Sequence, residues 1–599
     1  MKPSHQFKKF YLVFLTGLLI FSLSACSKSI VRNQIQPEGY PIAPDVQTTV
    51  QRTISPGATP ATAINLWEIP KYSQYGYGNW TYGPGLPYDK RLDIMPVTYS
   101  GSALTKKTKL LNFFTISDIH ITDKESPNQL IYLQRLHPKL PVGGSLYSGI
   151  MMFTTHVLDA TVQTVNALHN KDNKANPFDF GLSLGDTCNS TQYNELRWYI
   201  DVLDGKVIEP SSGAHLGYDT IDYQKSYKAA GLDKTIPWYQ TLGNHDHFWM
   251  GSIPVDYSLR KDLRQSFISD EVFATGDILA NPAIINNRDY YMGVFDGSTP
   301  YGDIIKAGPV ANFSSAPKVY ADRDRRSLLR TEWMNEFFNT SSIPAGHGFN
   351  LTDANNGFAC YSFMPKSNIP IKVIVLDDTQ KEDDGSADIH GHGFLDAARW
   401  VWLKKELADG DSAGQLMIIA AHIPINVEVT GNTSAGEMGW WLNPQNAVTL
   451  PDLIAELQSH PNLLAWLSGH RHLSTVKAFV SPDPVKAPEK GFWQVETPSL
   501  RDFPQQFRTF EIYLNSDYTI SIVATNVDPA VQDGTPAAAS RKYAIATAQI
   551  VETWGLTTKW NPTGDPTIKP MPTGSYNAEL IKQLSPAMKE KMRTLYPTP

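Results

Sequence analysis

Five short polar segments are spread over the chain, and each follows an apolar stretch with the character of a buried β-strand. They are ISDIH at 116–120, LGD at 184–186, LGNHD at 242–246, AAHIP at 420–424 and LSGHRH at 467–472. In open α/β sheets, functional loops gather beyond the carboxyl ends of the strands. The five segments can therefore converge, and the pattern predicts an α/β fold with one shared polar site.

The five segments supply side chains that bind hard or borderline metal ions. The candidate ligands are Asp118, His120, Asp186, Asn244, His422, His470 and His472. Each alone has an ordinary alternative: Asn244 as a turn residue, Asp118 as a helix cap, or His120 as a packed histidine. If these ordinary roles applied, all seven candidate ligands would have to lie at strand ends by chance. The set suits two adjacent metal ions, an arrangement that favours phosphoester hydrolysis.

The ordered series D-x-H, G-D, G-N-H-D, lone His and G-H-x-H resembles the calcineurin-like metallophosphoesterase superfamily, over roughly residues 108–525. The resemblance implies that Asp186 bridges two ions. One ion would also bind Asp118, His120 and His472, and the other Asn244, His422 and His470. It further implies attack by a metal-bridging hydroxide, with His245 as proton donor to the leaving group. Ligands without thiolate suit Mn, Fe or Zn, and Mg less readily.

Two residues beside these ligands each have two possible roles. Asp246 either orients or charges His245 as a second catalytic residue, or it caps a local turn. Asn189, in the run Gly185-Asp186-Thr187-Cys188-Asn189, supports the site or caps a turn. The tyrosine that defines purple acid phosphatases is absent from this run, so an Fe(III)–tyrosinate site is not expected.

The N-terminus predicts export and lipid anchoring. A basic leader with Lys2, Lys8 and Lys9 precedes an apolar stretch that is too short to span a membrane. The stretch ends in Leu23-Ser24-Ala25-Cys26, which resembles the bacterial lipobox and implies a lipid on Cys26 in the cell envelope, at the outer membrane in a Gram-negative organism. An ordinary secretory signal is the alternative. Removing the leader moves the formal charge from −7 to −10, which disfavours a nucleic-acid partner.

We expect a four-layer αββα sandwich of two mixed β-sheets flanked by helices, with a long insertion and terminal extensions. The expected divisions are a signal peptide at 1–25, a tether and aromatic extension at 26–105, a catalytic domain at 106–530 with an insertion at about 247–357, and a helical extension at 531–599. Helices are predicted over 392–407, 537–554 and 578–595, the last with a break at Pro586. The aromatic residues between 66 and 105 are expected to pack, and Cys188 and Cys360 to be free thiols.

The expected substrate is a phosphoester small molecule, with a phosphomonoester or nucleotide slightly favoured. A phosphodiesterase using the same site and a non-catalytic surface-binding lipoprotein are the alternatives. The stretch Gly181–Gly185 also fits the G-x-S-x-G motif of α/β-hydrolases. That motif needs its serine at the turn after the strand, whereas Ser183 lies inside the apolar run, so a serine nucleophile is disfavoured.

Overall fold

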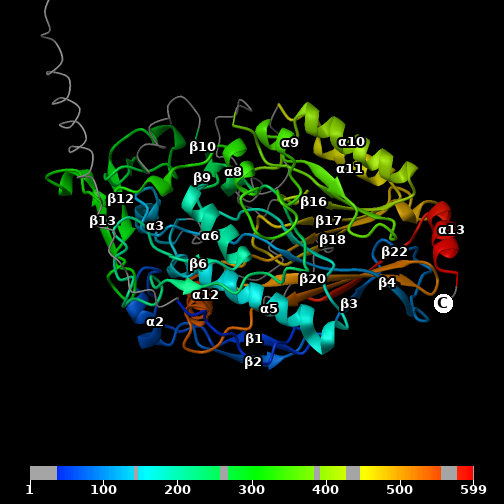
Figure 1. Cartoon of the computed structure of the whole chain (residues 1–599), viewed down its shortest axis with the longest axis horizontal. Coiled ribbons are helices and arrows are strands. Elements are labelled where there is room, and N and C mark those ends of the chain that lie inside the picture. Colours follow the sequence, from blue (N-terminus) through cyan, green and yellow to red (C-terminus); the bar gives the residue numbers. More distant parts are fainter. Residues whose placement is uncertain are drawn as a thin grey trace, which may run out of the picture. The chain divides into compact units, whose positions relative to one another are not determined.

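The computed structural model describes residues 37–139, 146–255, 268–382, 391–425, 445–554 and 576–597. The expected leader, Cys26 and the first part of the tether lie outside these residues. From Gly39 onward the chain forms one unit, which is built around two large mixed sheets (Figure 1). Within the described ranges, no helix is long and apolar enough to cross a membrane.

The first large sheet has seven strands. Their order is β3 (Asp89–Arg91), β22 (Ala578–Lys582), β21 (Ile520–Val527), β20 (Phe507–Asn515), β4 (Lys106–Ile116), β5 (Phe180–Ser183) and β8 (Trp238–Gln240). The strands β4, β5 and β8 run parallel to one another, and β20, β21 and β22 pair antiparallel. The carboxyl ends of β4, β5 and β8 therefore meet at one edge.

The second large sheet has six strands. Their order is β14 (Tyr361–Phe363), β15 (Ile371–Val375), β16 (Leu416–Ala420), β17 (Leu463–Ser468), β19 (Phe492–Glu496) and β18 (Val476–Phe479). The four inner strands run parallel, and β14 and β18 are antiparallel edges. Parallel strands covered on both faces read as continuous apolar runs, which is how Leu-Met-Ile-Ile-Ala of β16 reads.

The main core lies between the two sheets, as β16 illustrates. Leu416 and Ile418 are buried in the cluster that contains residues of β4 and β5. Met417 and Ile419 belong to a second cluster, with residues of α10 (Ala397–Ser412) and α11 (Leu450–Ser459). Successive side chains of a strand point to opposite faces, and each such buried side chain contributes about 1.5–3 kcal/mol.

Helices cover the outer face of each sheet. In Figure 1, α10 and α11 lie beyond β16 and β17, whereas α5 (Thr154–Lys174) and α12 (Pro536–Thr553) lie beyond β4 and β20. The helix α6 (Tyr193–Asp204) packs beside α5. The layers therefore run helix, sheet, sheet, helix, and the predicted αββα sandwich is confirmed.

Side-chain caps decide where two predicted helices begin. The helix expected over 392–407 begins at Ala397, because the carboxylate of Asp396 accepts a hydrogen bond from the backbone amide of Arg399 at 2.8 Å. The helix expected over 537–554 matches α12, which starts at Pro536 after the capping residue Thr535.

The expectation of a helix starting at 578 is wrong. Residues Ala578–Lys582 form β22, which pairs antiparallel with β21, and α13 (Pro586–Leu595) begins only after the capping residue Ser585. The sequence Ala-Glu-Leu-Ile-Lys favours a helix by intrinsic propensity. Pairing with the edge of β21 satisfies backbone groups that would otherwise stay unpaired, and this tertiary contact decides the outcome. In turn, β3 pairs with β22, so segments on both sides of 106–530 contribute strands to the sheet.

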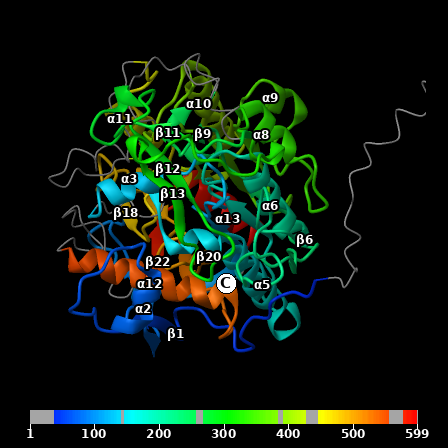
Figure 2. The same cartoon turned by 90° about the vertical axis from the view of Figure 1, so that its left-hand side faces the viewer.

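The aromatic segment between 66 and 105 packs against α12, and the expectation of packing is confirmed for Tyr72 and Tyr77. Both lie in a buried cluster with residues of α12, and the Tyr72 ring meets that of Tyr543 edge to face. Figure 2 shows α2 (Ile69–Tyr75) beside α12. Nearby, β1 (Arg52–Pro56) and β2 (Trp80–Pro84) form a two-stranded ribbon.

The expected insertion contains small elements of its own. They are β9 (Phe248–Trp249), β10 (Ile253–Pro254), β11 (Ala274–Thr275), β12 (Tyr290–Phe295), β13 (Ile304–Pro309), α8 (Arg330–Glu336) and α9 (Leu351–Asn355). The strands β11, β12 and β13 form one sheet, and β9 and β10 form a hairpin. Further short elements are α3 (Ile131–Leu136) and the pair β6 (Val207–Ile208) and β7 (Tyr227–Lys228).

Candidate metal centre

The five polar segments converge because each one leaves the carboxyl end of a parallel strand. Asp118 and His120 follow β4, Asp186 follows β5, Asn244 follows β8, His422 follows β16, and His470 and His472 follow β17. The two sheets therefore supply ligands from both sides. All seven predicted ligands belong to one neighbourhood, in which five are buried and His470 and His472 are half-buried, the side chain of His472 being 19% exposed.

The loops turn sharply at the ligands themselves. Five of the seven have left-handed backbone: Asp118 (φ 51°), His120 (φ 48°), Asp186 (φ 54°), His470 (φ 73°) and His472 (φ 60°). For residues with a side chain this conformation costs about 1–2 kcal/mol each. Such strain persists only where the surrounding structure enforces it, and it clusters at functional sites.

Glycine is required where the loops after β5 and β8 touch. A Cβ at Gly243 would come within 3.0 Å of the backbone nitrogen of Asp186 and of its carboxylate Oδ1, so only glycine allows this approach. The backbone amide of His245 then donates to the same carboxylate oxygen at 2.8 Å. The bridging candidate Asp186 is thereby fixed by the neighbouring loop.

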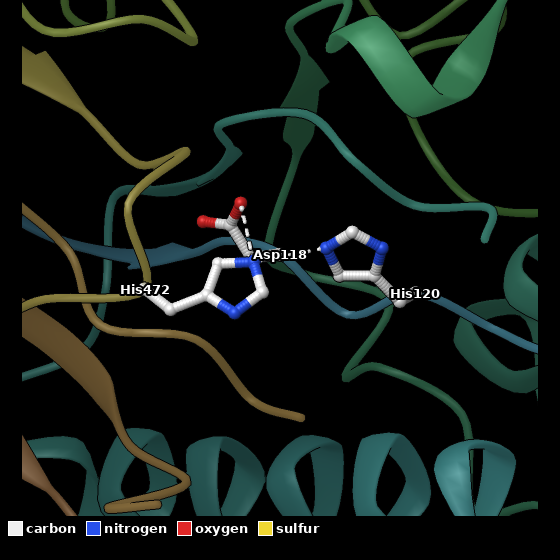
Figure 3. A group of neighbouring side chains, drawn as sticks. All are labelled: Asp118, His120 and His472. Atoms are coloured by element: carbon white, nitrogen blue, oxygen red, sulfur yellow. Dashed lines mark hydrogen bonds and ion pairs between the residues drawn. The ribbon is translucent and has the colours of Figure 1, made fainter. Parts of the chain in front are cut away.

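The first ligand group consists of Asp118, His120 and His472, whose side chains point toward one another (Figure 3). Nε2 of His472 lies 3.5 Å from Oδ1 of Asp118 and 3.1 Å from Nε2 of His120. The Asp118 carboxylate also accepts the backbone amide of His470 at 3.0 Å, which ties the loop after β4 to the loop after β17.

The second ligand group consists of Asp186, His422 and His470. Nε2 of His422 lies 3.3 Å from Oδ2 of Asp186, 3.2 Å from Nδ1 of His470 and 3.0 Å from Oδ1 of Asn244. Nδ1 of His422 donates to the carbonyl of Leu184 at 2.7 Å, which leaves Nε2 as the ligand atom.

Asp186 lies between the two groups. Its Oδ2 is 3.6 Å from Nε2 of His120 and 3.3 Å from Nε2 of His422. His120, Asp186 and His245 form a third set with ligand atoms close enough for a metal ion. Asp186 therefore lies within reach of one histidine from each group, and the division of the seven ligands between two ions stays a prediction.

The donor set fits cations. Nε2 of His120 faces Nε2 of His472 at 3.1 Å, and Nδ1 of His470 faces Nε2 of His422 at 3.2 Å. Ring nitrogens this close need a shared proton or a cation between them. Nitrogen and oxygen donors without thiolate suit Mn, Fe or Zn, and Mg less readily.

Opposite charges dominate the electrostatics among the ligand side chains. Burial alone would lower the pKa of His422, but Asp186 and Asp118 raise it to about 10. Burial alone would raise the pKa of Asp186, but His422 and His245 hold it well below its usual value. Burial lowers the pKa of His470 well below its usual value. A bound cation must therefore displace a proton from His422.

His245 lies at the edge of the ligand groups, with its ring centre 4.5 Å from that of His120. Its Nδ1 donates to the backbone carbonyl of Asn189 at 2.6 Å, so Nε2 is the atom left for a reacting group. The amide of Asn189 in turn accepts a hydrogen bond from the guanidinium of Arg501. Asn189 thus supports the site through its carbonyl.

The expected role of Asp246 in orienting His245 is not what its contacts indicate. Its carboxylate accepts backbone amides of Asp186, Thr187, Cys188 and Gly243, together with the Thr187 hydroxyl. The His245 ring is instead held by a carbonyl. Asp246 therefore fixes the turn after β5, in line with the alternative of a turn cap.

Two supporting carboxylates were not predicted from the sequence. Asp502 accepts a hydrogen bond from Nδ1 of His472, and Asp378 accepts the backbone amide of His422 at 3.2 Å. Asp378 follows the parallel strand β15, and this position at a strand end could have predicted its place in the site. Asp502 lies in the loop between β19 and β20, where no sequence motif marks it.

Neither cysteine nor Ser183 offers a competing nucleophile. Cys188 and Cys360 are buried free thiols, as expected, and burial raises the pKa of both. Ser183 ends β5 and is 1% exposed. The G-x-S-x-G match therefore has no exposed hydroxyl at a turn.

No family model and no curated protein matches this chain. Among solved structures, the chain is similar to a dimetal phosphatase from Danio rerio, at 13% identity and a TM-score of 0.34, covering 71% of this chain and 98% of that one. It is also similar to PhoD, at 11% identity and a TM-score of 0.30, covering 79% of this chain and 81% of that one. At these scores the two similarities do not establish a function.

Proposed function

We propose that this protein is a dinuclear metal-dependent hydrolase of phosphoesters. The observation that carries the proposal is the pair of adjacent ligand groups, each with carboxylate and imidazole donors, with the Asp186 carboxylate close to a histidine of each. Asp118, His120 and His472 would hold one ion with Asp186. Asn244, His422 and His470 would hold the other. Two adjacent divalent cations would neutralise the oxygens of a phosphoester and lower the pKa of water.

The protein's own groups have distinct tasks in this proposal. Asp118 fixes the backbone of His470, and Asp502 holds Nε2 of His472 toward the site. His245 presents Nε2 because its Nδ1 is occupied by the carbonyl of Asn189, so it would deliver a proton to the leaving alcohol. General acid catalysis of this kind contributes about 10²–10⁴-fold.

The preferred substrate is a phosphomonoester or nucleotide, and a phosphodiester is the second candidate. Hydrolysis of p-nitrophenyl phosphate and of bis-p-nitrophenyl phosphate, each with Mn²⁺ or with chelator, separates these two. Activity should depend on metal and fall by orders of magnitude in Asp186→Asn, because the Asp186 carboxylate lies close to a histidine of each ligand group. Turnover that survives chelation or this substitution would contradict the proposal. Metal binding without turnover of either ester would favour the non-catalytic alternative.

We propose as a separate point that the chain is anchored in the cell envelope through a lipid on Cys26. The support is the basic leader and the Leu23-Ser24-Ala25-Cys26 sequence. In a bacterial host, the wild-type chain should incorporate labelled palmitate and sediment with membranes, whereas Cys26→Ser should do neither. A Cys26→Ser variant that still carried the label would contradict lipidation at this residue.

A further inference from the structure

The tip of the β9–β10 hairpin folds back onto the residues that immediately precede it. The two strands pair antiparallel, with Trp249 opposite Ile253, so residues 250–252 form the turn. Met250 (φ 49°) and Gly251 (φ 66°) both have left-handed backbone, which makes this turn tight. It brings the backbone of Gly251 against both Asn244 and His245.

The first contact fixes the side-chain amide of Asn244. Its Nδ2 donates to the carbonyl of Gly251 at 2.8 Å. A carbonyl can only accept, so this bond assigns the nitrogen to the hairpin side and Oδ1 to the opposite side. There Oδ1 lies 3.0 Å from Nε2 of His422, within the second ligand group. A flipped amide would present its N–H groups to a cation and could not bind it.

The second contact seats the ring of His245. A Cβ at position 251 would come within 3.0 Å of Cδ2, Nε2 and Cγ of this ring, a separation that real Cβ atoms essentially never show. The ring is 7% exposed, and its Nδ1 is held by the carbonyl of Asn189 at 2.6 Å. It therefore cannot move aside without losing that bond. Glycine at 251 allows the ring to stay in place, because no Cβ occupies the space beside Cδ2 and Nε2.

We propose that Gly251 is a positioning residue that holds Asn244 and His245 at once, and so couples metal retention to proton donation. The catalytic part of this inference rests on the proposed function, whereas the seating of the His245 ring does not. The five polar segments do not include Gly251, so their sequences alone do not predict this contact. It depends on the fold of the hairpin that follows residues 242–246.

Unfolding of the metal-free protein tests the seating directly. Gly251→Ala should lower the thermal midpoint more than Gly534→Ala does, because Gly534 also has left-handed backbone (φ 82°) but its added Cβ would meet no described atom within 4 Å. In a His245→Ala background the extra loss should disappear, since the ring that clashes is gone. Equal effects of the two glycine substitutions, or losses that simply add in the double variant, would overturn the proposal.

Leaving-group dependence tests the catalytic part at saturating metal. An alkyl phosphate needs a proton donor, whereas p-nitrophenolate leaves readily without one, so Gly251→Ala should cost about 10²–10⁴-fold in kcat on ethyl phosphate and under about 10-fold on p-nitrophenyl phosphate. Its affinity for Mn²⁺ should fall by about 10–100-fold. Equal losses on both esters would overturn this part. A wild-type protein inactive on every ester would instead refute the proposed function, while the unfolding measurements would still decide the role of Gly251.

Discussion

Asp246→Asn should destabilise the whole fold, because this carboxylate accepts five hydrogen bonds from the loops that carry the site. Oδ1 accepts the backbone amides of Thr187 and Cys188 and the Thr187 hydroxyl, at 2.9, 3.2 and 2.6 Å. Oδ2 accepts the backbone amides of Asp186 and Gly243, at 3.0 and 2.8 Å. The side chain is buried, so water cannot replace these bonds.

The expected cost follows from the donors that asparagine leaves unpaired. If its oxygen takes the position with three donors, its NH₂ group faces the amides of Asp186 and Gly243, and two buried donors lose their acceptor. Each costs about 1–3 kcal/mol, so the free energy of unfolding should fall by about 2–6 kcal/mol. That is a large share of the roughly 5–15 kcal/mol typical of folded proteins.

Urea unfolding of the metal-free protein, followed by circular dichroism, measures this loss. Asp409→Asn is the matched control, because Asp409 is exposed and its carboxylate pairs with Lys405 across one helical turn, and it should leave the midpoint unchanged. A stability of Asp246→Asn within about 1 kcal/mol of wild type, together with a loss of kcat, would refute the reasoning and restore a catalytic role for Asp246.

Three further predictions concern separate parts of the molecule. Asp502→Asn should weaken Mn²⁺ binding by about 10–100-fold in a calorimetric titration, since its carboxylate orients His472; unchanged affinity would exclude this role. Burial lowers the pKa of His156 to about 3, so stability should fall as the pH drops below 6.5, by on the order of 2 kcal/mol at pH 5. His156→Phe should flatten this dependence in urea unfolding at several pH values, and an identical slope would contradict the assignment. Cys188 and Cys360 are buried, so a thiol reagent should label neither until the protein unfolds, and rapid labelling of the native protein would count against the packing.

The ligand groups could be predicted because their signals are local. A strand-like run followed by Asp or His places a side chain at a sheet edge, and the parallel strands β4, β5, β8, β16 and β17 bring those edges together. Spacing and residue type predicted the ligand positions, whereas the division of the ligands around Asp186 came only from the resemblance of the ordered motifs to a known superfamily.

The supporting contacts could not be predicted because they depend on tertiary packing. Asp502 reaches His472 across a loop that no motif marks, and the backbone of Gly251 reaches His245 only through the hairpin turn. Asp246 follows His245 in sequence, yet its carboxylate turns toward the amides of the loop after β5. Ala578–Lys582 forms a strand although its residues favour a helix, because the edge of β21 is available for pairing.

The number of metal ions bound per chain tests the central claim most directly. Chelator-treated protein should be titrated with Mn²⁺, freed of excess ion and analysed for metal content, alongside Asp186→Asn. The account predicts two ions per wild-type chain and one or none in the variant, because the Asp186 carboxylate lies between the two ligand groups and would bind both ions. A wild-type chain that binds no ion or a single ion, or a variant that keeps two, would contradict it.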